Sequence, residues 1–131
     1  MPVSHSIDRQ RRLITIVVAG DLDDSAFDMI ERDIASDPAY DRGYDCLIDA
    51  RAARKLIGSL GGLRGMAAKQ SVDPGVRRAI VTESLLFYGL ARVFQAVHDA
   101  RGLPDEVAVF RDIDAAAAWL AQPRAALSRG A

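Results

Sequence analysis

The segment from Tyr44 to Arg51 reads YDCLIDAR, and it decides the fold class of this chain. A short apolar run follows polar residues and ends with an acid and a base. This pattern is typical of a buried strand that places charged side chains at the edge of a sheet. The pattern recurs at 78–83 (RAIVTE) and at 107–112 (VAVFRD), and each copy is followed by a helix-like segment. This repeated strand-then-helix order predicts an α/β fold.

Ahead of that strand, the chain predicts a hairpin and a helix. Residues 13–18 (LITIVV) are rich in β-branched side chains and end at Gly20, while residues 3–7 alternate between apolar and polar side chains. We therefore expect an N-terminal hairpin. The acids between Asp21 and Ser25 predict the N-terminus of a first helix, which Pro38 ends.

The middle of the chain predicts a central strand followed by a helix. The strand runs from Cys46 to Asp49, with Asp49 and Arg51 expected at its carboxyl end. A basic connector with Arg54 and Lys55 follows it. The glycine-rich segment that begins at Ser59 then predicts a helix, and its N-terminus is expected beside Arg51, Arg54 and Lys55.

Two cap signals define the remaining elements. Ser84 is expected to cap a long helix that ends near His98, with His98 as a C-terminal cap. The last strand is expected at 107–110, and Asp112 should cap a final helix that Pro123 ends.

Composition favours one domain and excludes several classes of function. The chain has 131 residues of which 50% are hydrophobic, so we expect a single domain over 1–123 and a frayed tail over 124–131. A net charge of -1 gives no overall field that would attract nucleic acid or an anionic membrane. The lone Cys46 lies in an apolar run, which predicts a buried and inert thiol. With no signal-peptide pattern and no membrane-length apolar run, we expect a soluble, cytoplasmic protein.

The sequence contains no convincing catalytic, cofactor or metal motif. Asp49, Ser59 and His98 could form an acid, nucleophile and base, but Ser59 lacks the surrounding glycines of a nucleophile elbow. One cysteine and two widely separated histidines provide no ligand spacing for a metal. The glycines between Gly58 and Gly65 match neither nucleotide-binding fingerprint. We expect no enzyme, no cofactor and no metal.

The helix that starts at Ser84 is apolar over more of its circumference than a surface helix needs, so we expect it to bury two faces. Between these faces lies a polar ridge of Tyr88, Arg92, Gln95 and Asp99. A self-association surface or a ligand groove would use such a ridge, and an ordinary solvent-facing strip explains it equally well. We expect a homodimer that partly buries the ridge.

Several motifs together indicate a family. The residues concerned are Gly20-Asp21-Leu22, 37–45 (DPAYDRGYD), 47–51 (LIDAR), 88–95 (YGLARVFQ), 109–112 (VFRD) and Trp119-Leu120. This ordered set resembles the SpoIIAA-like family of small bacterial proteins, which are related to STAS domains, the modules of anti-sigma factor antagonists and sulfate-transporter tails. The resemblance implies a mixed sheet of about five strands with an N-terminal hairpin and about four helices, and it implies no enzyme.

The family resemblance also bears on Ser59. In phosphoregulated anti-sigma antagonists the switch serine lies in an Asp-Ser-Ser-Gly-type motif after the central strand, and Ser59 occupies that region here. The motif's aspartate is missing, since Ile57 and Gly58 precede the serine. Even without the motif, the surface around Ser59 would remain available to a partner or an anion.

These observations lead to two hypotheses about function. The first is a STAS-like regulatory or protein-interaction module without enzymatic activity, with binding residues Asp49, Arg51, Ser59, Tyr88 and Arg92. The second is a carrier or sensor of a small apolar or anionic ligand, with an apolar ligand lodged beside Phe87, Leu90 and Phe94.

Overall fold

The structure is a computed structural model that describes residues 3–57 and 73–123. Its centre is a five-stranded mixed sheet in the order β1-β2-β3-β4-β5. β1 and β2 form an antiparallel hairpin, and every later neighbour pairs in parallel. The expected mixed sheet with an N-terminal hairpin is therefore confirmed. The strands are β1 (Val3–Asp8), β2 (Leu13–Asp23), β3 (Asp45–Ile57), β4 (Arg77–Val81) and β5 (Glu106–Phe110).

Three helices lie in the described residues: α1 (Asp24–Ser36), α3 (Leu85–Ala100) and α4 (Ile113–Ala121). Each begins after a side chain that accepts a hydrogen bond from a backbone amide of the first turn, and these caps are Asp23, Ser84 and Asp112. The expected caps at Ser84 and Asp112 are confirmed. The fourth expected helix, from Ser59 to Lys69, and the expected frayed tail lie outside the described residues.

Two expected boundaries in the first half of the chain are wrong, because β2 and β3 are longer than their apolar runs. Asp21 lies in β2 and pairs with Lys55, so the basic connector and the first residues of the segment expected as a helix start are strand. The expected helix begins within that segment, at Asp24 after the cap Asp23. Each strand supplies the other's backbone hydrogen-bond partners, which outweighs the poor strand propensity of the charged residues. Gly20 does not end β2. It has a φ of 73° beside a register shift, as expected of a β-bulge.

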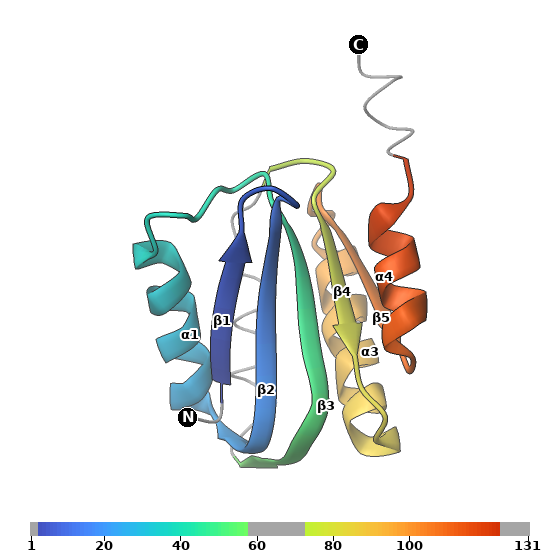
Figure 1. Cartoon of the computed structure of the whole chain (residues 1–131). Coiled ribbons are helices and arrows are strands. Elements are labelled where there is room, and N and C mark those ends of the chain that lie inside the picture. Colours follow the sequence, from blue (N-terminus) through green and yellow to red (C-terminus); the bar gives the residue numbers. More distant parts are fainter. Residues whose placement is uncertain (1–2, 58–72, 124–131) are drawn as a thin grey trace.

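The helices lie on both faces of the sheet, as Figure 1 shows. Side chains of β4 alternate between the two faces: Ala79 and Val81 pack against α4, whereas Ile80 packs against α3. α1 shares the α3 side, where Ala26 and Ile30 meet Phe87 in one core cluster. No helix in the described part of the chain is long and apolar enough to cross a membrane.

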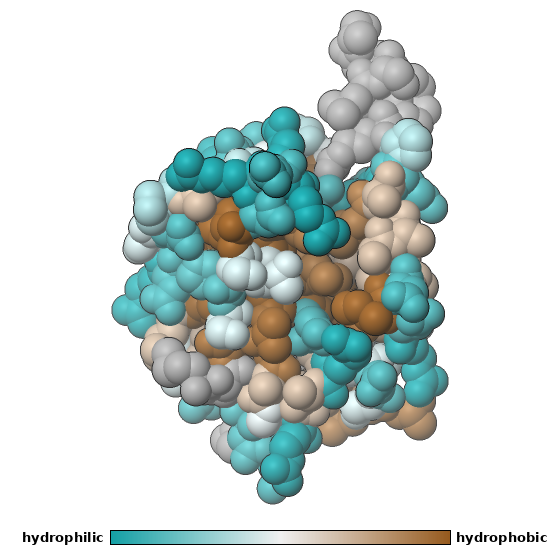
Figure 2. All heavy atoms as spheres, in the orientation of Figure 1, coloured by the Kyte–Doolittle hydropathy of each residue, from teal (hydrophilic) through white to brown (hydrophobic). Residues whose placement is uncertain are grey.

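The opposite face of β1, β2 and β3 carries no described helix, because α4 packs mainly on β4 and β5. We call this surface the open sheet face and define it by Thr15, Val17, Asp49 and Arg51. Figure 2 shows it from the front, with apolar atoms gathered over the middle of the sheet and hydrophilic atoms around them. The fold therefore provides two different surfaces on the two sides of one sheet.

Candidate binding sites

Asp49 and Arg51 form a rigid charged pair on the open sheet face. The Arg51 Nε and Nη2 atoms donate to the two oxygens of the Asp49 carboxylate, both at 2.8 Å. This bidentate contact lowers the pKa of Asp49, and burial opposes the shift. Arg51 was expected with Asp49 at the carboxyl end of the strand. That position is wrong, because β3 continues to Ile57 and the pair lies in its middle.

A shallow hollow of about 280 Å³ surrounds this pair. Its walls are formed by Val17, Asp49, Arg51, Ala52 and Glu83. Val17 is 40% exposed and contributes apolar surface to the hollow. We call this feature the Arg51 hollow. It combines an exposed apolar side chain with charges of both signs held in fixed positions.

The structure brings only some of the expected binding residues together. Tyr88 is connected to the Arg51 hollow indirectly, through Arg111. The Arg111 guanidinium is 5.9 Å from the Tyr88 ring centre, and it donates to the backbone oxygen of Glu83 at 3.4 Å. Arg92 is exposed on α3, and no described contact links it to the hollow. Ser59 lies outside the described residues.

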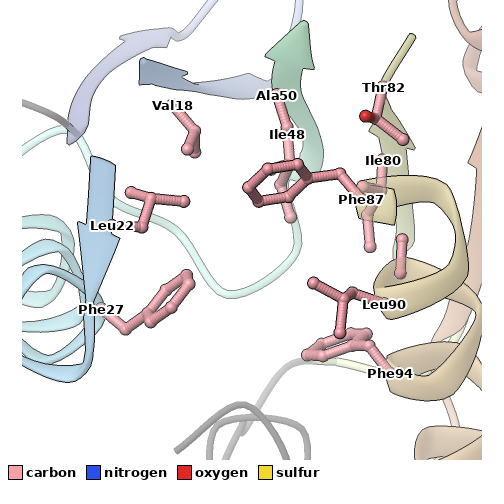
Figure 3. Close-up of a pocket in the computed structure, with 11 residues that line it drawn as sticks. Val18, Leu22, Phe27, Ile48, Ala50, Ile80, Thr82, Phe87, Leu90 and Phe94 are labelled. Atoms are coloured by element: carbon pink, nitrogen blue, oxygen red, sulfur yellow. The ribbon is translucent and has the colours of Figure 1, made fainter. Parts of the chain in front are cut away.

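The other side of the sheet contains an apolar groove between α1 and α3, shown in Figure 3. The part of it enclosed by side chains has a volume of about 80 Å³. Phe87, Leu90 and Phe94, the three residues expected beside an apolar ligand, all contribute to its wall. The described residues that line it are Val18, Leu22, Phe27, Ile48, Ala50, Ile80, Thr82, Phe87, Leu90, Ala91 and Phe94.

The sequence did not reveal Thr82, the one polar side chain among the described residues that line this groove. Thr82 is fully buried, and its Oγ1 has no hydrogen-bond partner among the described residues. The threonine follows directly after β4, where its β-branched side chain looked like a further strand residue. Because a missing partner is a property of the tertiary structure, no sequence signal could have identified it.

A buried ionic network at the other end of α3 was also missed. Asp105 accepts hydrogen bonds from Arg78 Nε at 2.8 Å and from His98 Nε2 at 2.8 Å, and all three side chains are at most 4% exposed. The expected role of His98 as a C-terminal cap is wrong, because its ring points into the protein and Arg101 is the residue at the C-cap. Two consecutive arginines entering a strand are the only sequence signal of this network.

Reactive groups are few in the described residues. Burial raises the pKa of the Cys46 thiol to about 12, so the thiolate, the reactive form, is scarce near neutral pH. This agrees with the expected buried thiol. The residues that the structure describes contain no group of three or more His, Cys, Asp or Glu side chains that could hold a metal ion.

Comparisons with known proteins agree with the architecture. The structure is similar to the crystal structure of an uncharacterised protein from the DUF3478 family with a SpoIIAA-like fold, from Shewanella loihica PV-4. The TM-score is 0.59 at 20% sequence identity, and the match covers 90% of this chain and 93% of the other. No family model and no curated protein matches the sequence. The chain has a SpoIIAA-like fold, which confirms for the fold the resemblance seen in the sequence.

Proposed function

We propose that this protein is a regulatory or protein-interaction module without enzymatic activity, and that it binds a protein partner at the Arg51 hollow. The observation that carries this proposal is the exposed Val17 beside the bidentate pair of Asp49 and Arg51. Interfaces gain specificity when apolar contact area lies next to charges in fixed positions.

The geometry also favours docking over chemistry at this hollow. Each Asp49 oxygen accepts a hydrogen bond from Arg51, and the same contact lowers the carboxyl pKa, so the side chain is a poor proton donor or acceptor near neutral pH. Arginine retains its charge at any physiological pH. The hollow therefore presents a stable charge pattern that a partner can match.

An Arg51→Ala variant tests this proposal. The pair is partly exposed, so its loss should change the free energy of unfolding by no more than about 1 kcal/mol. Partner binding should weaken strongly, because Asp49 would lose its counter-charge within the interface. The measurement is co-purification of a protein partner with tagged wild-type and variant chains, followed by a direct affinity measurement.

Arg101→Ala provides the matched control, since Arg101 is an exposed arginine at the far end of α3. It should capture the partner as the wild type does. Equal capture by all three proteins would refute the assignment of the interface to the Arg51 hollow.

A second candidate function is the carriage or sensing of a small apolar ligand, and the apolar groove favours it. Of the eleven described residues that line it, ten are apolar, and they include three aromatic rings. Pockets that bind small molecules are typically lined in this way, with few polar groups. A Leu90→Arg variant would place a charge in the wall and should abolish co-purification of an apolar molecule, as measured by native mass spectrometry.

Ala96→Arg is the control for this experiment, because Ala96 is exposed on the same helix and does not line the groove. It should retain the ligand. If neither the wild type nor Ala96→Arg carries a small molecule, or if Leu90→Arg retains one, the carrier function is wrong.

A further inference from the structure

We propose that the ligand of the apolar groove carries a single uncharged hydrogen-bonding group, a carbonyl or a hydroxyl, and that the Thr82 hydroxyl binds this group. The proposal rests on the carrier function described above and identifies the chemical class of its ligand. It follows from one polar atom in an otherwise apolar wall.

The Thr82 hydroxyl is unusual for a buried group. The side chain is 0% exposed, and Oγ1 has no partner among the described residues, whereas buried polar side chains are nearly always hydrogen-bonded. The backbone amide of Thr82 donates to the Phe110 oxygen at 3.0 Å, so the backbone there is anchored to β5. In Figure 3 the hydroxyl oxygen projects from its strand toward the side where Ala50 and Phe87 lie.

A valine would fit the same position without this hydroxyl. Threonine and valine have the same branched shape, and the ten other lining residues are apolar. An unsatisfied hydroxyl at this position weakens the folded protein unless something pairs with it. A ligand in the groove provides that partner, since the hydroxyl can either donate to a carbonyl or accept from a hydroxyl.

The rest of the groove limits the class of ligand. Among the described residues that line the groove none is ionisable, so a charged group placed against them would lose its hydration without an ionic partner. The enclosed volume of about 80 Å³ is roughly half that of a cavity known to hold benzene. We therefore expect a compact aliphatic ketone, ester or alcohol, or one such end of a longer molecule that extends out of the groove.

Two small probes of equal shape test this inference: acetone and isobutene. They differ only in whether a carbonyl oxygen or a methylene group occupies the same position. Their affinities for the wild type, Thr82→Val and Thr82→Ser are measured by NMR titration of the full chain. The informative quantity is the ratio of the two affinities in each protein, because the ratio cancels general effects on the groove.

We expect the ratio of the ketone's affinity to the alkene's affinity to fall by about 3- to 10-fold when Thr82 is replaced by valine. The ratio should be largely retained in Thr82→Ser. Thr82→Val should also be at least as stable as the wild type without ligand, since it removes an unsatisfied hydroxyl. An unchanged ratio with clear binding of both probes would overturn the role of Thr82 and leave the carrier function standing. If neither probe binds any of the three proteins, both are wrong.

Discussion

At the scale of single residues, the buried ionic network of Arg78, Asp105 and His98 carries a large desolvation free energy. An ion pair so deeply buried loses the hydration of both charges, and only good geometry and further hydrogen bonds compensate for that loss. Asp105 meets part of this requirement by accepting from Arg78 Nε through one oxygen and from His98 Nε2 through the other, while Nη1 and Nη2 of Arg78 are buried without a hydrogen-bond partner among the described residues. It thereby joins β4, the C-terminal half of α3 and the segment that leads into β5.

Asp105→Asn should therefore destabilise the protein severely. The variant leaves the Arg78 guanidinium buried without its counter-charge, and we expect a loss of about 3–5 kcal/mol in the free energy of unfolding. Urea denaturation followed by circular dichroism measures this loss. The matched control is Asp99→Asn, since the Asp99 side chain is 66% exposed, and its effect should stay within about 0.5 kcal/mol. Equal effects of the two substitutions would show that the network contributes little.

At the scale of elements, Arg77 fixes the end of α4. Its guanidinium donates to the backbone oxygens of Trp119 at 3.0 Å, Gln122 at 2.7 Å and Pro123 at 3.2 Å, and it lies 5.6 Å from the centre of the Trp119 ring. The last carbonyls of a helix have no partner within the helix, and an arginine from the sheet satisfies them here. α4 is thus held to β4 by charge-assisted hydrogen bonds as well as by apolar packing.

Arg77→Met should loosen this attachment while keeping most of the side-chain volume. We expect a loss of about 2–3 kcal/mol in the free energy of unfolding, because hydrogen bonds to charged groups are among the stronger ones. Trp119 is the only tryptophan, so a change in its fluorescence would report the altered end of α4. The control is Arg111→Met, which removes one exposed bond of 3.4 Å to Glu83. A stable Arg77→Met protein with unchanged tryptophan emission would contradict this role.

The sequence predicted those features that depend on neighbouring residues. Ser84 and Asp112 were identifiable as caps because the amides they bind are two or three residues away. The full length of β3 could not be predicted from the sequence, because its charged second half is a strand only through pairing with β2. The partner of Arg78 was hidden for the same reason, since Asp105 is 27 residues distant in sequence. Long-range pairing leaves no local pattern.

At the scale of the whole molecule, the two faces of the sheet are suited to different tasks. The open sheet face offers charges and an exposed valine to a large partner, whereas the groove side offers enclosed apolar space to a small one. β3 contributes to both, because Ile48 and Ala50 line the groove while Asp49 and Arg51 line the Arg51 hollow. A protein partner and a small ligand could therefore bind the same domain at once without competing for space.

We also propose that the protein forms a homodimer through α3, as its apolar circumference suggested. The stripe of Phe87, Ala91, Phe94 and His98 is buried against the protein's own core. Outside this stripe, Leu85 is 74% exposed and Leu86 is 63% exposed, and they form an apolar patch at the start of the helix. Such adjacent exposed leucines are typical of association surfaces.

A Leu86→Arg variant should shift this dimer to monomer, because the single two-fold interface would gain two desolvated charges of like sign, one from each chain. Light scattering coupled to gel filtration at micromolar concentration measures the molecular mass of both proteins. Met29→Arg, at a side chain 42% exposed on α1, is the control and should remain dimeric. A wild-type protein with the mass of one chain, or a Leu86→Arg protein that is still dimeric, would exclude α3 as the dimer interface. Unchanged unfolding of Leu86→Arg would confirm that the substitution acts on association and not on the fold.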